Sequence, residues 1–111
     1  MVKNIPERGD IVWMNGDKGF GHEQLGTRPA LIMTEYLYNK KTGCAIVCLL
    51  TRKTKGYATE VFCHVGGEDS VILVDQIRLI DCKERKVKFI TAAPREVLRE
   101  VEEKMRTLLS L

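Results

Sequence analysis

The sequence predicts a mainly β fold, a small antiparallel barrel or partly open sheet, with one helix at the C-terminal end. Short apolar runs rich in β-branched residues alternate with turn residues up to Ile90. From Pro94 the apolar residues change to helical spacing. Strands this short and closely spaced leave no room for the crossover helices of a parallel sheet, so we expect antiparallel pairing.

The apolar runs make six or seven strands plausible. The first run, 10–14, ends at the turn signal Asn15-Gly16-Asp17, and the glycine-rich stretch from Gly16 to Gly26 is expected to form a long, flexible loop. Residues 28–33 follow, with Pro29 tolerated because it stands at the start of that strand. The other expected strands are 44–50, which Thr51 closes, 59–65, 71–80 and 86–90, with turn signals at 39–43, 51–56, 66–70 and 83–85.

The C-terminal residues are expected to form an amphipathic helix that caps the sheet. Two charge pairs at i,i+4 spacing, Glu100 with Lys104 and Glu102 with Arg106, support it. Its apolar stripe is expected to consist of Val97, Leu98, Val101, Met105, Leu108 and Leu109.

Length and composition indicate one globular domain spanning residues 1–111. Hydrophobic residues make up 44% and charged residues 30% of the chain, which favours neither disorder nor a fibrous class. No apolar run approaches the roughly 20 residues of a membrane helix, and the first residues lack the apolar core of a signal peptide. We therefore expect a cytoplasmic protein that does not associate with a membrane.

The four cysteines are expected to be buried, reduced thiols. Cys44, Cys48, Cys63 and Cys82 include no C-x-x-C pair. Cys44 and Cys48 lie four residues apart on one strand, about 13 Å, which is beyond the reach of a disulfide. His64 points away from Cys63 on a strand, so we expect no metal site and no cofactor.

One region of the chain is locally cationic although the net charge is only +3. Residues 36–59 contain five basic residues and no Asp or Glu. A solvated face and a phosphate-binding surface explain this pattern equally well, so charge alone leaves both alternatives open. The basic residues are Lys40, Lys41, Arg52, Lys53 and Lys55.

Several motifs, in order and at similar spacing, resemble the MazF/PemK toxin family and cover nearly the whole chain. The more specific ones are G-H-E-Q-x-G-x-R-P-A from Gly21, T-x-x-x-K-G-Y from Thr51 and D-Q-I-R from Asp75, with R-G-D-x-x-W from Arg8 before them. The resemblance implies a barrel like that of Src-homology-3 domains, of the CcdB/PemK toxin type, and a homodimer. It also implies a type II toxin that cleaves single-stranded mRNA at selected sequences without a metal ion, and a cognate acidic antitoxin of the MazE type.

In that family an arginine of the R-P-A segment and a threonine after the third strand form the catalytic pair, which the resemblance assigns to Arg28 and Thr51. The guanidinium can grip phosphate oxygens in two places, and because it stays protonated we favour phosphate stabilisation over a role as base. Thr51 can donate its hydroxyl to the same phosphate. Further candidates for RNA binding are His22, Glu23, Gln24, Lys55, Tyr57 and Arg78.

Two other functions compete with RNA cleavage. A barrel of the same family that binds RNA or an antitoxin without cutting would show the same charge pattern. A gyrase poison like CcdB shares the barrel, but that family works through a tryptophan near its C-terminus, whereas the only tryptophan here is Trp13. The chain also lacks the aromatic residue and the proline that the family commonly has after the first strand, which affects the expected RNA preference more than the fold.

Overall fold

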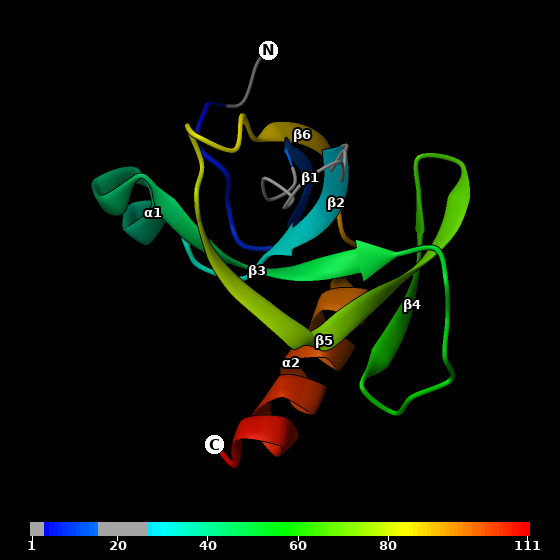
Figure 1. Cartoon of the computed structure of the whole chain (residues 1–111). Helices are drawn as coiled ribbons and strands as arrows, with labels where there is room; N and C mark the ends of the chain where they lie inside the picture. Colours follow the sequence, from blue (N-terminus) through cyan, green and yellow to red (C-terminus); the bar gives the residue numbers. More distant parts are fainter. Residues whose placement is uncertain (1–3, 16–26) are drawn as a thin grey trace, which may run out of the picture.

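The computed structural model describes residues 4–15 and 27–111, which form a curved sheet and two helices (Figure 1). The strands are β1 (Asp10–Asn15), β2 (Thr27–Ile32), β3 (Cys44–Thr51), β4 (Glu60–Val65), β5 (Glu68–Asp81) and β6 (Lys88–Ala92). The helices are α1 (Tyr36–Thr42), between β2 and β3, and α2 (Arg95–Leu109), after β6.

All six strands pair antiparallel in one sheet with the order β4-β5-β3-β2-β1-β6. The sheet curls into a half-barrel whose edge strands are β4 and β6, and α2 packs below it against β4 and β5 (Figure 1). The predicted mainly β fold with a C-terminal helix is therefore confirmed.

An irregularity in β5 bends the sheet. Cys48 pairs with Ile77 but the next residue of β3, Leu49, pairs with Leu73, so residues 74–76 stand outside the ladder. Val74 is nevertheless buried, and its N–H donates to the carbonyl of Thr59 at 3.0 Å. Extra residues on one strand increase its local twist, and β5 pairs with both β3 and β4 before the irregularity but with β3 alone after it.

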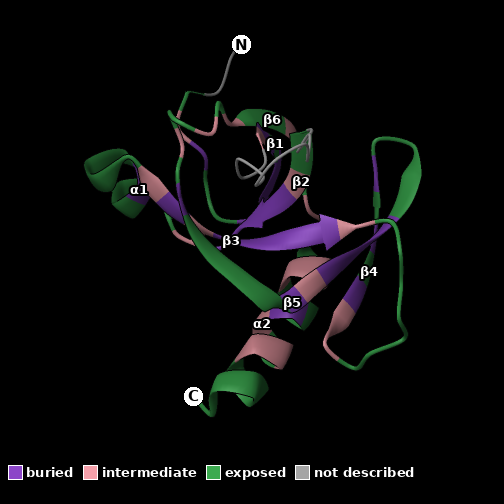
Figure 2. Cartoon of the chain, viewed as in Figure 1, coloured by how far each residue is buried: buried purple, intermediate pink, exposed green. Residues whose placement is uncertain are grey.

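Each face of the sheet carries its own cluster of apolar residues. Figure 2 shows that buried residues run along β3 and the neighbouring part of β2. On one face Ile11, Leu31 and Cys48 pack with Val101 of α2. On the other, Val12 and Ala30 pack with Ile80, against which Val87 also lies. Sequential residues of β1 and β2 thus alternate between the two clusters, as the period of a β-strand requires.

The connection between β4 and β5 is shorter than the predicted 66–70 turn. Only Gly66 and Gly67 separate the strands, with φ values of 58° and 84°. Positive φ at both central residues matches the right-handed twist of a two-residue hairpin, and glycine adopts it without steric cost. Residues 68–70, predicted to be turn, therefore belong to β5.

The predicted turn at 39–43 is wrong, because these residues end helix α1. Gly43 terminates the helix at φ 72°, and its N–H donates to the carbonyl of Asn39. The buried side chain of Asn39 donates to the carbonyls of Pro6 and Thr34 at 2.8 and 3.0 Å. Seven residues give too few turns for a helical apolar period to be visible in the sequence.

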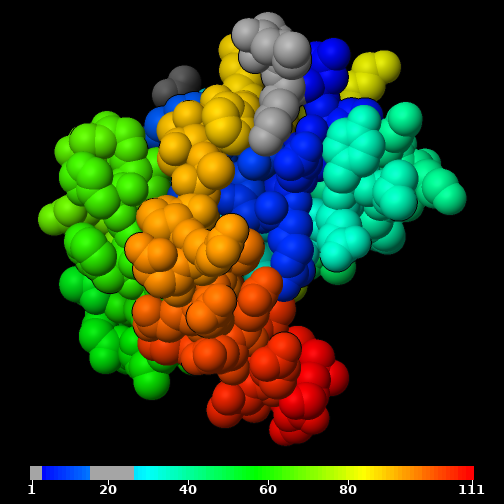
Figure 3. Space-filling model, turned by 180° about the vertical axis from the view of Figure 1, so that it is seen from behind, coloured from blue at the N-terminus to red at the C-terminus, as the bar shows by residue number. Residues whose placement is uncertain are grey.

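Helix α2 confirms the predicted C-terminal helix, but only part of its stripe is covered. Val101 is fully buried, whereas Leu108 and Leu109 are 44% and 49% exposed. In a view from behind, the C-terminal segment lies between the segment around residues 50–65 and the N-terminal strand (Figure 3).

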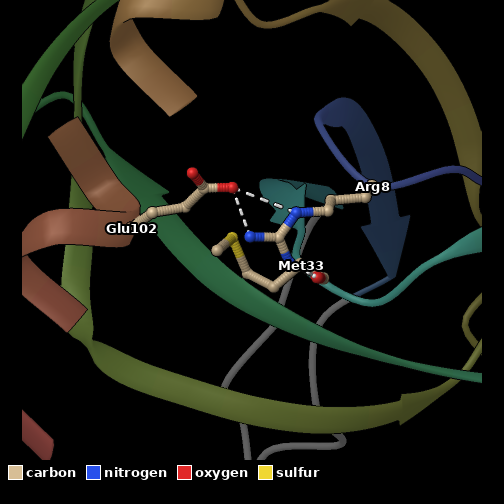
Figure 4. A network of polar contacts seen from close by, with 3 residues as sticks. All are labelled: Arg8, Met33 and Glu102. Carbon is tan, nitrogen blue, oxygen red and sulfur yellow. Dashed lines mark hydrogen bonds and ion pairs between the residues drawn. The ribbon is translucent and has the colours of Figure 1, made fainter. Parts of the chain in front are cut away.

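A polar contact fixes α2 to the N-terminal segment (Figure 4). The Arg8 guanidinium donates through two nitrogens to Glu102 and through the third to the carbonyl of Met33. Glu102 therefore pairs with Arg8, not with Arg106 as predicted, while the Glu100–Lys104 pair is present at 3.4 Å.

The last strand begins later than predicted, at Lys88 instead of Lys86. Lys86 has φ 51°, in the left-handed region that a strand does not use. Its N–H donates to the carbonyl of Lys83, and this hydrogen bond closes a turn at residues 83–86.

The four cysteines are all free thiols, but only Cys48 and Cys63 are buried as predicted, while Cys44 and Cys82 are half-buried. Burial, with the nearby Asp75 carboxylate, raises the pKa of Cys48 to about 12. Neither helix in the described parts of the chain is long and apolar enough to cross a membrane.

Candidate active site

Arg28 and Thr51 lie on neighbouring strands of the sheet. β2 and β3 pair from Ile32 with Val47 to Ala30 with Leu49, and Arg28 and Thr51 each lie two residues beyond this last pair, at the same end of the ladder. Two residues are one full period of a strand, so both side chains are on the same face as Ala30 and Leu49. The two predicted catalytic side chains, 23 positions apart in the sequence, are thus neighbours in the fold.

Both residues line one pocket of about 420 Å³. Its walls come from β1, β2, the end of β3 and the β4–β5 hairpin, and they include Trp13, Ser70 and Glu68. Trp13 is 42% exposed, so its ring is accessible from solvent. The pocket therefore combines an exposed aromatic ring with a guanidinium and a hydroxyl, groups that suit a nucleotide. We name it the Arg28 pocket.

The charges around this pocket are mainly cationic. Arg28 is exposed, and within residues 4–15 and 27–111 its guanidinium forms no ion pair. Arg52 and Lys53 also line the pocket, and Arg52 donates to Glu68 at 2.8 Å. Exposed ion pairs of this kind contribute little, at most about 1 kcal/mol, so a phosphate can compete for Arg52.

The Thr51 hydroxyl is oriented by the turn that follows β3. Its oxygen accepts the N–H of Lys53 at 3.2 Å, and the residue is half-buried. Accepting this bond leaves the O–H proton free to be donated elsewhere. Thr51 can therefore offer a fixed hydrogen-bond donor beside Arg28.

The loop that carries Lys55 and Tyr57 is built around the carboxylate of Glu60. This carboxylate accepts the Thr54 hydroxyl, the Lys55 N–H at 2.9 Å and the Gly56 N–H at 3.2 Å. The Thr54 hydroxyl, followed by the backbone N–H groups, lowers the pKa of Glu60 below its usual value. The loop is thus held in one conformation, with Tyr57 61% exposed.

Of the other predicted RNA-binding residues, Arg78 is not part of the Arg28 pocket. On β5, Arg78 pairs with Val47 of β3, so it faces the same side of the sheet as Thr51. Val47 is four residues before Thr51, which is about 13 Å along the strand. The predicted sites His22, Glu23 and Gln24, like the loop from Gly16 to Gly26, lie outside the described residues. In the described part of the chain, no three His, Cys, Asp or Glu side chains come together as metal ligands do.

The sequence-based prediction did not include Trp13 or Ser70 among the site residues, and it treated Arg52 and Lys53 only as part of a cationic stretch. All four line the Arg28 pocket. Arg52 and Lys53 directly follow Thr51 in the sequence, and this position is a signal that could place them at the site. Ser70 carried no such signal, because only the short hairpin brings it next to β3.

Known proteins match the chain over nearly its full length. Residues 7–109 match the family described as PemK-like, MazF-like toxins of type II toxin-antitoxin systems. The endoribonuclease toxin MazF of Escherichia coli strain K12 is 36% identical over 106 residues, 95% of each chain. Endoribonuclease EndoA of Bacillus subtilis strain 168 is 31% identical over 113 residues, 96% of this chain and 97% of that protein.

Solved structures agree with these relatives. The crystal structure of MazE-MazF from Deinococcus radiodurans superposes with a TM-score of 0.90 at 38% sequence identity, covering 98% of this chain and 99% of that chain. The sequence match and the shared half-barrel agree. The chain belongs to the PemK-like, MazF-like toxin family of type II toxin-antitoxin systems.

Proposed function

We propose that this chain is an endoribonuclease toxin that cleaves single-stranded RNA at the Arg28 pocket without a metal ion. The observation that carries the proposal is that Arg28 and Thr51, at the same end of the β2–β3 ladder, line one pocket. The endoribonuclease names of its relatives support the same activity.

RNA supplies its own nucleophile, the 2′-hydroxyl next to the phosphate. When its oxygen bonds to phosphorus, the 2′-hydroxyl loses its proton to water, the bond from phosphorus to the 5′-oxygen breaks, and that oxygen takes a proton from water. The products carry a 2′,3′-cyclic phosphate and a 5′-hydroxyl. The chain must therefore position the phosphodiester and stabilise the crowded, negatively charged phosphorane.

Arg28 and Thr51 match these two requirements. The planar guanidinium of Arg28 can hold two phosphate oxygens, and the oriented Thr51 hydroxyl can donate to a third position on the same group. Positioned donors of this kind are worth about 10² to 10³ in rate. Neither role needs a change in protonation of the residue. A mechanism built on two histidines is disfavoured, because it would need both histidines of the chain, and His64 of β4 does not line the Arg28 pocket.

The proposal includes a partner. The structure with TM-score 0.90 is a MazE-MazF complex, so we propose that an acidic antitoxin of the MazE type neutralises this chain. Cationic residues at the pocket are suited to acidic side chains as well as to phosphate. A homodimer of the 1–111 domain and a cytoplasmic site of action, where mRNA is translated, belong to the same proposal.

Cleavage of a mixed-sequence single-stranded RNA in EDTA tests the activity. We expect cuts by the wild-type chain, loss of about 10² to 10³ in rate for Arg28→Ala, and an unchanged rate for Arg99→Ala, an exposed arginine of α2. Absence of cleavage, or cleavage that Arg28→Ala leaves intact, would favour a binding protein that does not cut.

A deoxyribose at the cut nucleotide tests the nucleophile. Removing the 2′-hydroxyl should leave binding nearly intact and convert the substrate into an inhibitor. Continued cleavage of the deoxyribose analogue would exclude attack by the 2′-hydroxyl.

A further inference from the structure

A second pocket, of about 450 Å³, adjoins the Arg28 pocket. The two pockets share Arg52 and Ser70 in their walls. The second pocket also contains the rings of Tyr57 and Phe62, which come from the loop before β4 and from β4 itself. We name it the Phe62 pocket. The two pockets together can therefore hold adjacent nucleotides of one strand.

The register of the sheet places the Phe62 pocket close to the proposed reacting phosphate. Thr51 pairs with Val71 of β5, and Val71 pairs with Phe62 of β4. The three residues thus form one row across adjacent strands, on one face. Strands lie about 4.7–4.9 Å apart, so Phe62 stands about 10 Å from Thr51, close enough to meet a nucleotide that flanks the cut.

The two aromatic rings of this pocket are open to solvent. Phe62 is 62% exposed and Tyr57 is 61% exposed, although large aromatic side chains are more often mostly buried. Exposed aromatic rings suit stacking with the bases of a single strand. The occupant that matches these rings is a nucleobase.

The walls of the pocket are held in place before any ligand binds. Glu60 fixes the segment from Thr54 to Gly56 through its carboxylate and the Tyr57 carbonyl through its own N–H, at 3.1 Å. The ammonium of Lys104, on α2, donates to the Glu60 carbonyl at 2.9 Å. Because the carboxylate, the N–H and the carbonyl of Glu60 all form hydrogen bonds, this wall loses little conformational freedom when a ligand binds.

The polar groups of the pocket are rich in hydrogen-bond acceptors. Asp69 lines it, and one of its carboxylate oxygens pairs with Nδ1 of His64 at 2.9 Å, across the β4–β5 ladder. Ser70, next to Asp69 in the sequence, also lines the pocket. Carboxylates accept hydrogen bonds from the exocyclic amino groups of adenine, cytosine and guanine, whereas uracil has no such group and offers only its ring N3–H between two carbonyl oxygens.

We propose that the Phe62 pocket stacks the base of a nucleotide flanking the cleaved phosphate and prefers a base with an exocyclic amino group over uracil. This inference rests on the proposed RNA cleavage and adds a specificity site to it. Phe62 provides the stacking surface, and Asp69 provides the acceptor that distinguishes the bases.

Sequencing the ends of cuts made in a randomised RNA, in EDTA, tests the inference. For the wild-type chain we expect one position flanking the cut to be depleted of uracil. Asp69→Asn, which replaces one acceptor oxygen with a donor, should remove most of that depletion. Phe62→Leu should raise KM about tenfold with little change in kcat, and Phe62→Trp should restore KM.

Phe89→Leu is the matched control, because Phe89 is 43% exposed on β6, at the opposite edge of the sheet. Its base preference and KM should equal those of the wild type. Equal use of all four bases by the wild-type chain would overturn the inference, as would an unchanged preference in both Phe62→Leu and Asp69→Asn. Those results leave cuts that depend on Arg28 in place, whereas failure of the proposed function would remove the cuts themselves.

Discussion

Arg28 of β2 and Thr51 of β3 line one pocket at the same end of the β2–β3 ladder, Arg28 exposed and Thr51 half-buried. Both residues belong to strands of one sheet, so the sheet positions their backbones. This relationship allows the two residues to be tested separately, since each has a conservative replacement.

Arg28→Lys tests whether two-point contact with phosphate matters. Lysine keeps the positive charge but cannot donate two parallel hydrogen bonds. We expect a rate at least tenfold below the wild type but above that of Arg28→Ala, measured in single-turnover cleavage. A rate for Arg28→Lys equal to the wild type would show that charge alone is sufficient, and Arg99→Lys controls for the substitution itself.

Thr51→Val tests the hydroxyl while preserving the shape of the side chain. Loss of one hydrogen bond to a charged phosphate costs about 1.5–3 kcal/mol, which corresponds to a rate reduction of roughly 10- to 100-fold. Thr51→Ser should stay close to the wild type because it keeps the donor and the acceptor for Lys53. If Val and Ser replacements cleave equally well, Thr51 has no role through its hydroxyl.

The Glu60 carboxyl should titrate below the usual glutamate pKa of about 4.3. Hydrogen bonds from Thr54, then from Lys55 and Gly56, stabilise the ionised form, so the ordered loop is favoured at neutral pH and loses this contribution as the pH falls through the lowered pKa. NMR titration of the Lys55 and Gly56 amide protons measures it. A midpoint at or above the usual value would contradict the hydrogen bonding, and Glu60→Gln should abolish the transition.

Gly9→Ala should destabilise the fold more than Gly43→Ala. Both glycines have positive φ, 93° and 72°, but only at Gly9 would an added Cβ meet a neighbour, Cδ2 of Leu98 at 3.2 Å. Backbone strain of about 1–2 kcal/mol is common to both, and the contact with α2 adds to it at Gly9. Thermal unfolding followed by circular dichroism measures the difference. Equal losses of Tm would mean that Leu98 moves aside freely.

The strands could be predicted from the sequence because their apolar runs are bounded by turn residues. The run from Cys44 to Leu50 and its closing Thr51 match β3 as observed. The α1 helix could not be predicted in this way, because only its C-terminal glycine is a strong signal and the same residue is typical of turns. The pairing of Glu102 with Arg8 is also invisible in the sequence, since the two residues are 94 positions apart.

The pair Arg28 and Thr51 could be predicted only from the family resemblance, because an arginine before a proline is in most proteins a surface residue. Trp13 and Ser70 enter the same pocket through the register of β1 with β2 and through the short β4–β5 hairpin. The register of β5 with β3 also depends on the irregularity in β5, which no residue pattern in the sequence predicts. The sequence therefore predicts the proposed catalytic residues better than it predicts the other residues that line the pocket.

The most direct test of the proposed activity is the chemistry of the RNA ends formed in EDTA. Wild-type chain should leave a 2′,3′-cyclic phosphate on one fragment and a 5′-hydroxyl on the other, and Arg28→Ala should reduce both at least a hundredfold. Fragments that carry a 5′-phosphate, or cleavage that requires a divalent cation, would contradict attack by the 2′-hydroxyl at the Arg28 pocket.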